Sequence, residues 1–405
     1  MKRHPIFASL IICGLCSEFG CSADTAPGTG TPAGGGTTAQ GGNTASGGQA
    51  AVAGSATGGN GGAGGTAAGG AAGSAGSVNP TAGTGGAAGA AGGTGGAAGG
   101  SAGGGGTGGV AVIPPFTGKL AVIDYSPYRD GQAPGGGQQP TEADVREDLE
   151  ILAQLADGVR IYGTDGGNAH VPALCDELGL NLHIGAWIDG LPSDGPNVDA
   201  LMAIVNQEHP SIKTAVIGNE VLNRVDDNML TEQNLIDFVT QARAALTATG
   251  VQIAVAETYP RWMEMRPNLA ASVDMIIWHT YGWWSGADIN AAAALIYSRY
   301  QDMLTNYPGK PMVLGETGWP SMYDHMSMDM TTTAVGSEEN QWRYYDEVLG
   351  ILQMNGLEAW PFSAFDENWK ATSGEGMVGA HWGIFNEDRT PKLAATMLLA
   401  AAGAN

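Results

Sequence analysis

Two glutamates at the ends of apolar segments offer the clearest chemistry in this 405-residue sequence. Glu220 follows the apolar segment Thr214–Gly218 and Asn219, and Glu316 ends the segment Met312–Glu316. Hydrolysis of a glycosidic bond uses two facing carboxyl groups, a protonated one for the leaving oxygen and an ionised one that attacks the sugar or activates water. A single glutamate at such a position would equally well cap a helix or pair with a basic residue, so the prediction depends on the pair.

The segments that position these glutamates alternate between two patterns from Lys119 onward. Short apolar runs predict the strands Leu120–Tyr125, Gly158–Tyr162, Asn181–Ile188, Thr214–Gly218, Gln252–Glu257, Met275–Tyr281, Met312–Glu316 and Ala359–Phe365. Apolar residues spaced by three and four predict the helices Glu142–Ala156, Asn197–Gln207, Glu232–Thr247, Ala291–Asn306, Glu338–Asn355 and Pro391–Ala402. This alternation predicts an α/β fold, a (β/α)8 TIM barrel over residues 115–405. An open doubly wound sheet is the alternative, but no Gly-rich dinucleotide motif follows the first strand.

Carboxylates and aromatic rings gather at the predicted strand ends, where barrels of this kind build their active sites. Besides the two glutamates, Glu257 ends the fifth strand, and we expect it to be a further sugar contact. Aromatic rings give stacking surfaces to the apolar faces of sugars, and together they indicate a carbohydrate cleft, although any one ring would also fit core packing. The rings are Tyr162, Trp187, Tyr259, Trp283, Trp284, Trp319 and Trp369.

Six segments resemble, in order along the barrel, those of glycoside hydrolase family 17, the β-1,3-glucanases and related glucan-remodelling enzymes. They are Tyr125–Arg129, Val159–Gly163, Ile217–Val221, Gly315–Ser321, Phe365–Lys370 and His381–Phe385. The loop Glu375–Gly379 resembles bacterial members more than plant ones. The resemblance implies that Glu220 is the general acid/base and Glu316 the nucleophile of a retaining, double-displacement mechanism.

The same resemblance implies further contacts with substrate. Asn219 would hydrogen-bond the sugar 2-hydroxyl, and Tyr281 would orient Glu316, although a ring at the barrel rim would also explain Tyr281. The loop after the eighth strand carries Glu367, Lys370 and Glu375, which would bind sugar hydroxyls near the catalytic pair. A solvated surface charge explains Glu375 equally well. Tyr162 and Trp319 complete the expected substrate-binding residues.

We expect neither a cofactor nor a metal. The barrel sequence has no His-Glu-x-x-His segment, no paired cysteine ligands and no Gly-x-Ser-x-Gly elbow. His279 has no second histidine at ligand spacing, which favours a hydrogen-bonded histidine of the active site or core. The Met-rich stretch with His325, from Met322 to Met330, fits a wall of the cleft better than a copper site.

The N-terminal part predicts export. A short basic start and the apolar run from Ile6 to Leu15 predict a signal peptide over residues 1–21. Gly20 and Cys21 resemble a bacterial lipoprotein cleavage site, which would make Cys21 a lipidated anchor. The stretch from Thr25 to Gly118 has no charged residue and little to bury, which predicts a disordered Gly/Ala-rich linker over 22–114. We expect an extracellular or surface-tethered protein that meets a membrane only through that anchor.

Charge narrows the class of partner. Forty acidic residues against 17 Lys and Arg give a net charge of −23, which excludes nucleic acid and favours a neutral ligand. The sequence therefore predicts a secreted, monomeric glycoside hydrolase that cleaves β-1,3-glucan from within or from an end. Two alternatives stay open: a β-1,3-glucan transglycosylase with the same residues, and a non-catalytic glucan-binding surface protein.

Overall fold

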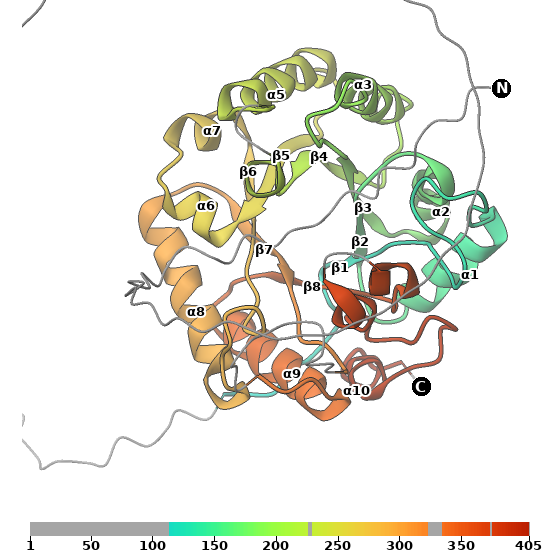
Figure 1. Cartoon of the computed structure of the whole chain (residues 1–405), viewed down its shortest axis with the longest axis vertical. Helices are drawn as coiled ribbons and strands as arrows, with labels where there is room; N and C mark the ends of the chain where they lie inside the picture. The colour runs from blue at the N-terminus through green and yellow to red at the C-terminus, as the bar shows by residue number, and fades with distance from the viewer. Residues whose placement is uncertain (1–112, 226–228, 323–333, 373–374, 405) are drawn as a thin grey trace, which may run out of the picture. The chain divides into compact units, whose positions relative to one another are not determined.

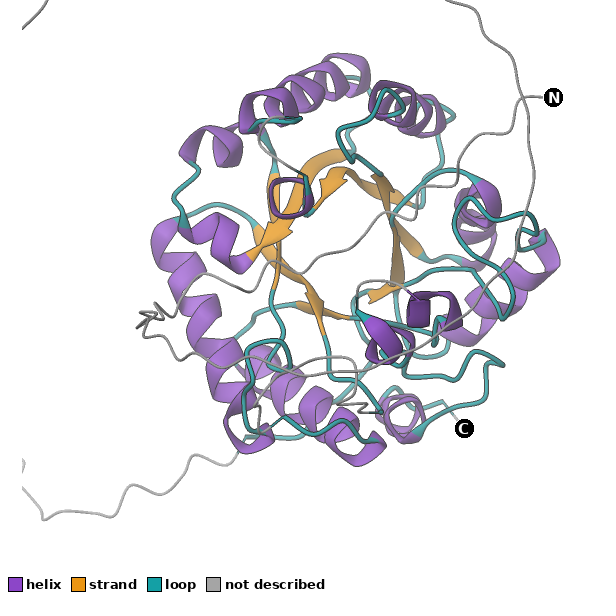
Figure 2. Cartoon of the chain, in the orientation of Figure 1, coloured by secondary structure: helices purple, strands orange, loops and turns teal. Residues whose placement is uncertain are grey.

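Eight parallel strands form a ring at the centre of the protein, and helices surround it (Figure 1). The structure is a computed structural model and describes residues 113–225, 229–322, 334–372 and 375–404. The strands pair in chain order and are β1 (Ile123–Asp124), β2 (Gly158–Ile161), β3 (Asn181–Ala186), β4 (Ile212–Asn219), β5 (Gln252–Thr258), β6 (Met275–His279), β7 (Met312–Thr317) and β8 (Ala359–Pro361). Figure 2 shows the strands inside and the helices outside, which is the arrangement of a (β/α)8 barrel.

The ring closes between its last and first strands through a backbone bond just beyond β8. Ala364 donates its N–H to the carbonyl oxygen of Asp124 at 2.8 Å. The predicted eighth strand is longer than the observed one, because the chain leaves its ladder with β7 after Pro361 and turns towards β1. Phe365 then pairs with Phe385 in an isolated bridge. The barrel predicted from the sequence is therefore confirmed, although β1 and β8 are each four residues shorter than expected, and β3 and β6 each end two residues earlier.

The helices begin at residues that suit helix starts. Thr141 and Thr231 each form a capping box, and the side chains of Asp288 and Ser337 accept bonds from backbone N–H groups of the first turn. The helices are α1 (Glu142–Leu152), α2 (Val171–Leu178), α3 (Asp194–Val205), α4 (Val221–Arg224), α5 (Glu232–Leu246), α6 (Tyr259–Met263), α7 (Pro267–Ser272), α8 (Ile289–Asn306), α9 (Glu338–Met354) and α10 (Leu393–Ala401), with the 3₁₀ helices η1 (Gly166–His170), η2 (Asn368–Thr372) and η3 (Gly376–Ala380).

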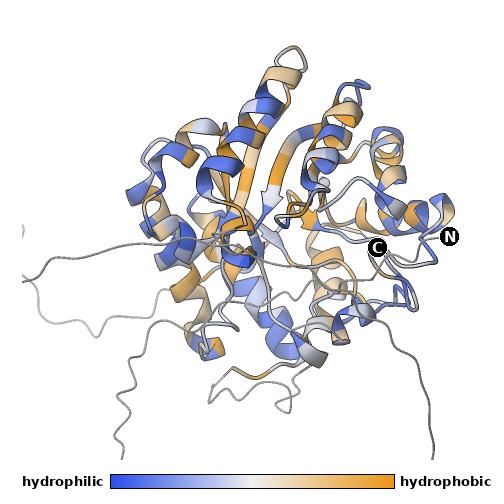
Figure 3. Ribbon diagram, turned by 45° about the horizontal axis from the view of Figure 1, so that its top comes forward, coloured by the Kyte–Doolittle hydropathy of each residue, from blue (hydrophilic) through white to orange (hydrophobic). Residues whose placement is uncertain are grey.

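The core has two parts, because each strand buries both of its faces. A large cluster joins the outward strand residues to the apolar faces of the helices. A smaller cluster of strand residues, among them Ala254, Ala256 and Trp360, alternates with the first and fills the inside of the ring. Figure 3 shows hydrophilic and hydrophobic positions alternating along the outer helices, as expected for helices that cover a barrel on one face.

The segment that leads into β1 lies against the last two helices. Phe116 donates its backbone N–H to Asp346 of α9, and Gly118 donates to the carbonyl oxygen of Ala401 at the end of α10. Ile113 and Pro114 approach α9 at Gly350. The barrel therefore includes the chain from residue 113. Within the described ranges, no helix combines the length and the apolar character needed to span a bilayer.

Candidate active site

Glu220 and Glu316 meet at the ends of β4 and β7, on the side of the barrel where the strands terminate. One oxygen of each carboxylate and one ring nitrogen of His279 all lie within 4.8 Å of one another. Glu220 is 9% exposed and Glu316 5% exposed, so the pair is largely removed from water but keeps a small accessible surface. The sequence pattern predicted these two positions, and the barrel brings them together.

His279 bridges the two carboxylates. Its Nδ1 lies 2.9 Å from Oε1 of Glu220, and its Nε2 lies 3.5 Å from Oε1 of Glu316. Strand register explains the placement, because His279 on β6 stands beside Glu316 on β7. The sequence predicts that His279 is a hydrogen-bonded histidine of the active site or core. In the structure, His279 links the two candidate catalytic residues.

The surroundings of Glu316 favour its ionised form. Burial alone would raise the pKa of Glu316, but His279, Arg160 and the hydroxyl of Tyr281 outweigh that effect and lower the pKa below its usual value. Nη1 of Arg160 lies 3.2 Å from Oε1, and the Tyr281 hydroxyl donates to Oε2 at 2.8 Å. An ionised carboxylate at this position can act as a nucleophile.

Arg160 on β2 organises the site and was missed in the sequence. Its Nη1 donates to the carbonyl oxygen of Gly315 at 2.9 Å, and its Nη2 donates to Oδ1 of Asn219 at 2.6 Å. Arg160 is only 1% exposed. The sequence does contain a signal for this role: Arg160 lies inside a four-residue strand whose other residues are apolar, and all four are buried. A buried charge of this kind needs buried partners. These bonds fix Asn219 and the end of β7 together.

Asp124 at the end of β1 lies beneath the same arginine. Its Oδ1 is 3.5 Å from Nη1 of Arg160, and neither carboxylate oxygen has a hydrogen-bond partner among the described residues. Burial raises the pKa of Asp124 well above its usual value, more than the nearby Arg160 lowers it. A third carboxyl group therefore lies buried beside the arginine that contacts Glu316.

The backbone at Glu220 turns sharply. Glu220 has φ 50° and ψ 35°, a left-handed conformation that non-glycine residues seldom adopt. Its N–H donates to the carbonyl oxygen of Ala256 on β5 at 2.8 Å, which keeps the turn attached to the barrel. The turn directs the side chain towards His279 and Glu316 instead of along β4.

The loop after β8 brings its three expected residues together. Nζ of Lys370 lies 2.5 Å from Oε2 of Glu367 and 4.6 Å from the centre of the Phe362 ring. Burial raises the pKa of Glu375, although Lys370 opposes this effect. Burial would lower the pKa of Lys370, but Glu367 and Glu375 raise it. The three residues form one charged group near the two catalytic candidates.

Two expected sugar contacts occupy other places. Trp319 is fully buried, donates Nε1–H to the carbonyl oxygen of Val335 and packs edge-on against Trp283 at 5.5 Å. Glu257 is also fully buried, and its Oε1 accepts a bond from the backbone N–H of Leu222 at 2.7 Å. Both side chains turn into the protein because packing and hydrogen bonds hold them there. Of the expected aromatic platforms, those partly exposed are Tyr162, Trp187, Tyr259 and Trp369.

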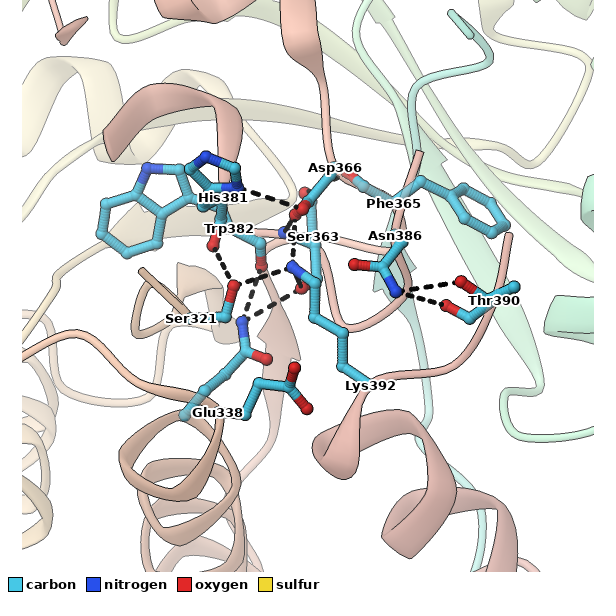
Figure 4. Close-up of polar contacts among 12 residues, drawn as sticks. Ser321, Glu338, Ser363, Phe365, Asp366, His381, Trp382, Asn386, Thr390 and Lys392 are labelled. Carbon is cyan, nitrogen blue, oxygen red and sulfur yellow. Dashed lines mark hydrogen bonds and ion pairs between the residues drawn. The ribbon is translucent and has the colours of Figure 1, made fainter. Parts of the chain in front are cut away.

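A buried ion pair between Lys392 and Asp366 joins the loops after β7 and β8 to the start of α10 (Figure 4). Nζ of Lys392 lies 2.6 Å from Oδ1 of Asp366 and donates to Oγ of Ser321 at 2.8 Å. It also donates to the carbonyl oxygen of Gly383 at 2.9 Å. The neighbouring ring of Trp382 packs against Tyr281 at 5.2 Å. The loops after β7 and β8 are therefore fastened to the start of α10, and this holds the ring whose hydroxyl contacts Glu316.

The geometry does not favour a metal here, although Glu220, His279 and Glu316 offer three ligand atoms. The guanidinium of Arg160 lies 3.2 Å from both His279 Nε2 and Glu316 Oε1, and its charge opposes a cation at the same place. Cys21, His325 and the methionines 326, 328 and 330 lie outside the described residues. Cys175 is a buried free thiol whose pKa burial raises to about 12, as expected for an inert core residue.

Residues 122–383 match the BtgE/BtgC glycoside hydrolase domain. The chain belongs to this glycoside hydrolase family. The match spans β1 to the segment after η3 and includes both candidate glutamates. The predicted class of enzyme, a glycoside hydrolase, is thereby confirmed.

Two curated relatives of this BtgE/BtgC-family hydrolase come from fungi. The glucan endo-1,3-β-glucosidase btgC of Emericella nidulans is 25% identical over 291 residues, which is 67% of this chain and 44% of that protein. The glucan 1,3-β-glucosidase of Arthroderma benhamiae is 25% identical over 272 residues, 63% of this chain and 85% of that protein. The chain thus spans less than half the length of the btgC relative.

Solved structures agree with the barrel of this BtgE/BtgC-family hydrolase. The glycoside hydrolase family 17 β-1,3-glucanosyltransferase of Rhizomucor miehei superposes with a TM-score of 0.59 at 25% identity, covering 68% of this chain and 96% of that one. An endo-laminarinase from Formosa Hel1_33_131 shares the fold with a TM-score of 0.60 at 20% identity, covering 70% and 86%. The resemblance to family 17 is confirmed, and the expected bacterial type stays a prediction.

Proposed function

We propose that this chain is an exported enzyme that acts on β-1,3-glucan with retention of configuration. The observation that carries the proposal is the short distance between Glu220 and Glu316: one oxygen of each carboxylate lies within 4.8 Å of one oxygen of the other. Retaining glycosidases hold their two carboxyl groups about 5–5.5 Å apart, whereas inverting ones need about 6.5–9.5 Å to admit a water molecule. The substrate class is supported by the names of the relatives, each of which acts on β-1,3-glucan.

In the first step, the carboxylate of Glu316 attacks the anomeric carbon while Glu220 gives its proton to the departing oxygen. The glycosidic bond breaks as the bond to Glu316 forms. In the second step, Glu220 takes a proton from an incoming hydroxyl, whose oxygen displaces Glu316 from the sugar. Asn219, held by Arg160, is suited to bind the 2-hydroxyl beside the reacting carbon, and Tyr162 and the Glu367–Lys370–Glu375 group to bind neighbouring sugar hydroxyls.

The incoming hydroxyl decides between hydrolysis and transfer. Water gives a hydrolase, and the hydroxyl of a second sugar gives a transglycosylase with the same residues. Transfer is a specific second candidate because the Rhizomucor miehei structure is named a β-1,3-glucanosyltransferase. A protein that only binds glucan would make no use of the ionised state that the surroundings of Glu316 favour.

Product chromatography tests the proposal. The barrel is incubated with a linear β-1,3-glucan oligosaccharide beside its Glu316→Gln variant. Shorter products that the variant does not make would establish hydrolysis, and longer products would establish transfer. Binding of the oligosaccharide by both proteins without any product would leave a glucan-binding protein and overturn the enzymatic proposal.

Export and anchoring are a separate part of the proposal. Residues 1–21 would act as the export signal with cleavage between Gly20 and Cys21, Cys21 would carry lipid, and the chain from residue 22 to residue 112 would link it to the barrel. A chain beginning at Ile113 should fold and keep its turnover, because the contacts of residues 113–118 with α9 and α10 are retained. Loss of folding would contradict the boundary, and mass spectrometry of the exported protein would test lipid at Cys21.

A further inference from the structure

The helix α4 begins directly after Glu220 and lacks its own cap. A residue at the start of a helix ordinarily has an extended backbone, and its side chain accepts a bond from an N–H of the first turn. Glu220 occupies that position with a left-handed backbone, and its side chain makes no capping bond. Its carboxylate instead contacts His279. The first N–H groups of α4 therefore need an acceptor from elsewhere.

Glu257 supplies that acceptor from the neighbouring strand. Its Oε1 accepts the N–H of Leu222, the second residue of α4, at 2.7 Å. Glu257 has no exposed surface, so neither solvent nor substrate reaches it in this arrangement. The end of β5 thus performs for α4 the task that the side chain of Glu220 would perform in an ordinary helix.

The same turn is fastened on its other side by Arg224, the last residue of α4. Nε and Nη2 of Arg224 both donate to the carbonyl oxygen of Asn219, at 3.0 and 2.6 Å. Nη2 also donates to the carbonyl oxygen of Ile188 after β3. Glu220 is therefore held on both sides: Arg224 binds the carbonyl oxygen of Asn219 before it, and Glu257 binds the N–H of Leu222 after it. Of these two side chains, only Glu257 changes its charge in the neutral pH range.

We propose that Glu257 is a positioning residue that caps α4 in place of Glu220 and so holds the Glu220 carboxyl facing Glu316. The inference deepens the proposed function, since it assumes that Glu220 is the acid/base. It replaces the sugar contact expected from the sequence with a role that acts through the backbone.

The charge of Glu257 makes this role measurable. Burial raises the pKa of Glu257 to about 8; the Leu222 N–H lowers it, Glu220 raises it, and Arg224 and Arg266 lower it. Its Oε2 has no partner among the described residues. An unfolded glutamate has a pKa of 4.5. The folded state therefore holds the proton more tightly, and the stability associated with the neutral carboxyl is lost as pH rises from 4.5 to about 8.

Three variants test the proposal in the full barrel: Glu257→Gln, Glu257→Ala, and Glu150→Gln as a control at an exposed glutamate of α1. Glutamine keeps the oxygen that accepts from Leu222, so its kcat should stay within about threefold of wild type. Alanine removes the cap, and its kcat should fall about tenfold to a hundredfold with little change in KM, because a misplaced catalytic group affects turnover more than binding.

Thermal unfolding gives a readout that does not need turnover. The difference in Tm between Glu257→Gln and wild type should grow from pH 4.5 to about 8 and then level off, while the Glu150→Gln difference stays flat. A Tm difference between Glu257→Gln and wild type that does not change with pH would show that Glu257 is not a neutral buried carboxyl at low pH. Wild-type kcat in Glu257→Ala, or equal damage in both variants, would overturn the positioning role. If Glu257→Ala does not fold, a kcat of Glu257→Gln more than tenfold below wild type would overturn the positioning role.

The two levels of the proposal fail in different ways. A wild-type protein that turns over no β-1,3-glucan while the Tm difference behaves as expected would refute the proposed function and leave Glu257 as a buried cap. A wild-type protein that turns over glucan while Glu257→Ala matches it would refute the positioning role alone.

Discussion

The hydroxyl of Tyr281 donates a 2.8 Å hydrogen bond to Oε2 of Glu316. The Tyr281 ring lies edge-on against Trp382 at 5.2 Å and against Phe362 at 6.0 Å, so the hydroxyl has little freedom to turn away. Arg160 contacts the other oxygen of the same carboxylate. Both oxygens of Glu316 are thus engaged by donors that stabilise its negative charge.

Replacing Tyr281 with phenylalanine should make the enzyme less active in acid. The variant loses a donor that lowers the pKa of Glu316, so that pKa rises. Glu316 reacts only when ionised, and the acidic limb of the kcat/KM profile should therefore move to higher pH. Tyr297→Phe is the control, since the Tyr297 hydroxyl bonds Asn355 at the surface. An acidic limb that stays in place would show that Tyr281 does not set the charge of Glu316.

Glu316→Gln should reduce turnover of a β-1,3-glucan oligosaccharide by several orders of magnitude, because the amide cannot form the covalent intermediate. Binding of the oligosaccharide, measured by calorimetry, should persist. Glu339→Gln, at an exposed glutamate in the first turn of α9, should behave as wild type. Turnover near the wild-type rate in Glu316→Gln would remove this residue from the mechanism.

Glu220→Ala should affect substrates according to their leaving groups. Cleavage of a glucan needs a proton on the departing oxygen, and loss of the general acid typically costs about 10²–10⁴-fold. An aryl glucoside with an acidic phenol leaves without that proton, so formation of its covalent intermediate should be much less affected. Stopped-flow release of the phenol measures this step. Equal losses for both substrates would argue against Glu220 as the proton donor.

Lys392→Met should destabilise the fold. It leaves Asp366, which is 3% exposed, without its 2.6 Å partner, and breaking a buried ion pair on one side costs about 3–5 kcal/mol. The double variant Lys392→Met with Asp366→Asn removes the unpaired charge and should recover part of the loss. Equilibrium unfolding in urea measures both. A single variant as stable as wild type would show that the pair does not fasten these loops.

The strand ends were predictable because local pattern decides them. Each barrel strand is a short apolar run, and the residue that follows it lies at the catalytic face whatever the loops do. Glu220 and Glu316 could be placed from this rule alone. The residues that flank the two glutamates then indicated the chemistry. The register of the barrel strands brings Glu220 and Glu316 together as expected.

The direction of each side chain could not be read in the same way. Glu257 and Trp319 also follow or end strands, but a hydrogen bond from Leu222 and a packed Trp283 draw them inward. Arg160 was overlooked because its partners are far along the chain, with Asn219 59 positions and Glu316 156 positions away. Its role depends on contacts that exist only once the ring has closed.

The contacts of residues 116–118 have a consequence for how a polymer reaches the protein. The segment lies along the second half of α9, near Gln353, and beside the last residue of α10, while the glutamates stand where the strands end. Helices of such a barrel run back from the strand ends, so the polypeptide enters at the rear of the molecule. A glucan bound at the strand ends would therefore lie on the opposite side of the barrel from residues 116–118, and its length would not be limited by contact with this segment.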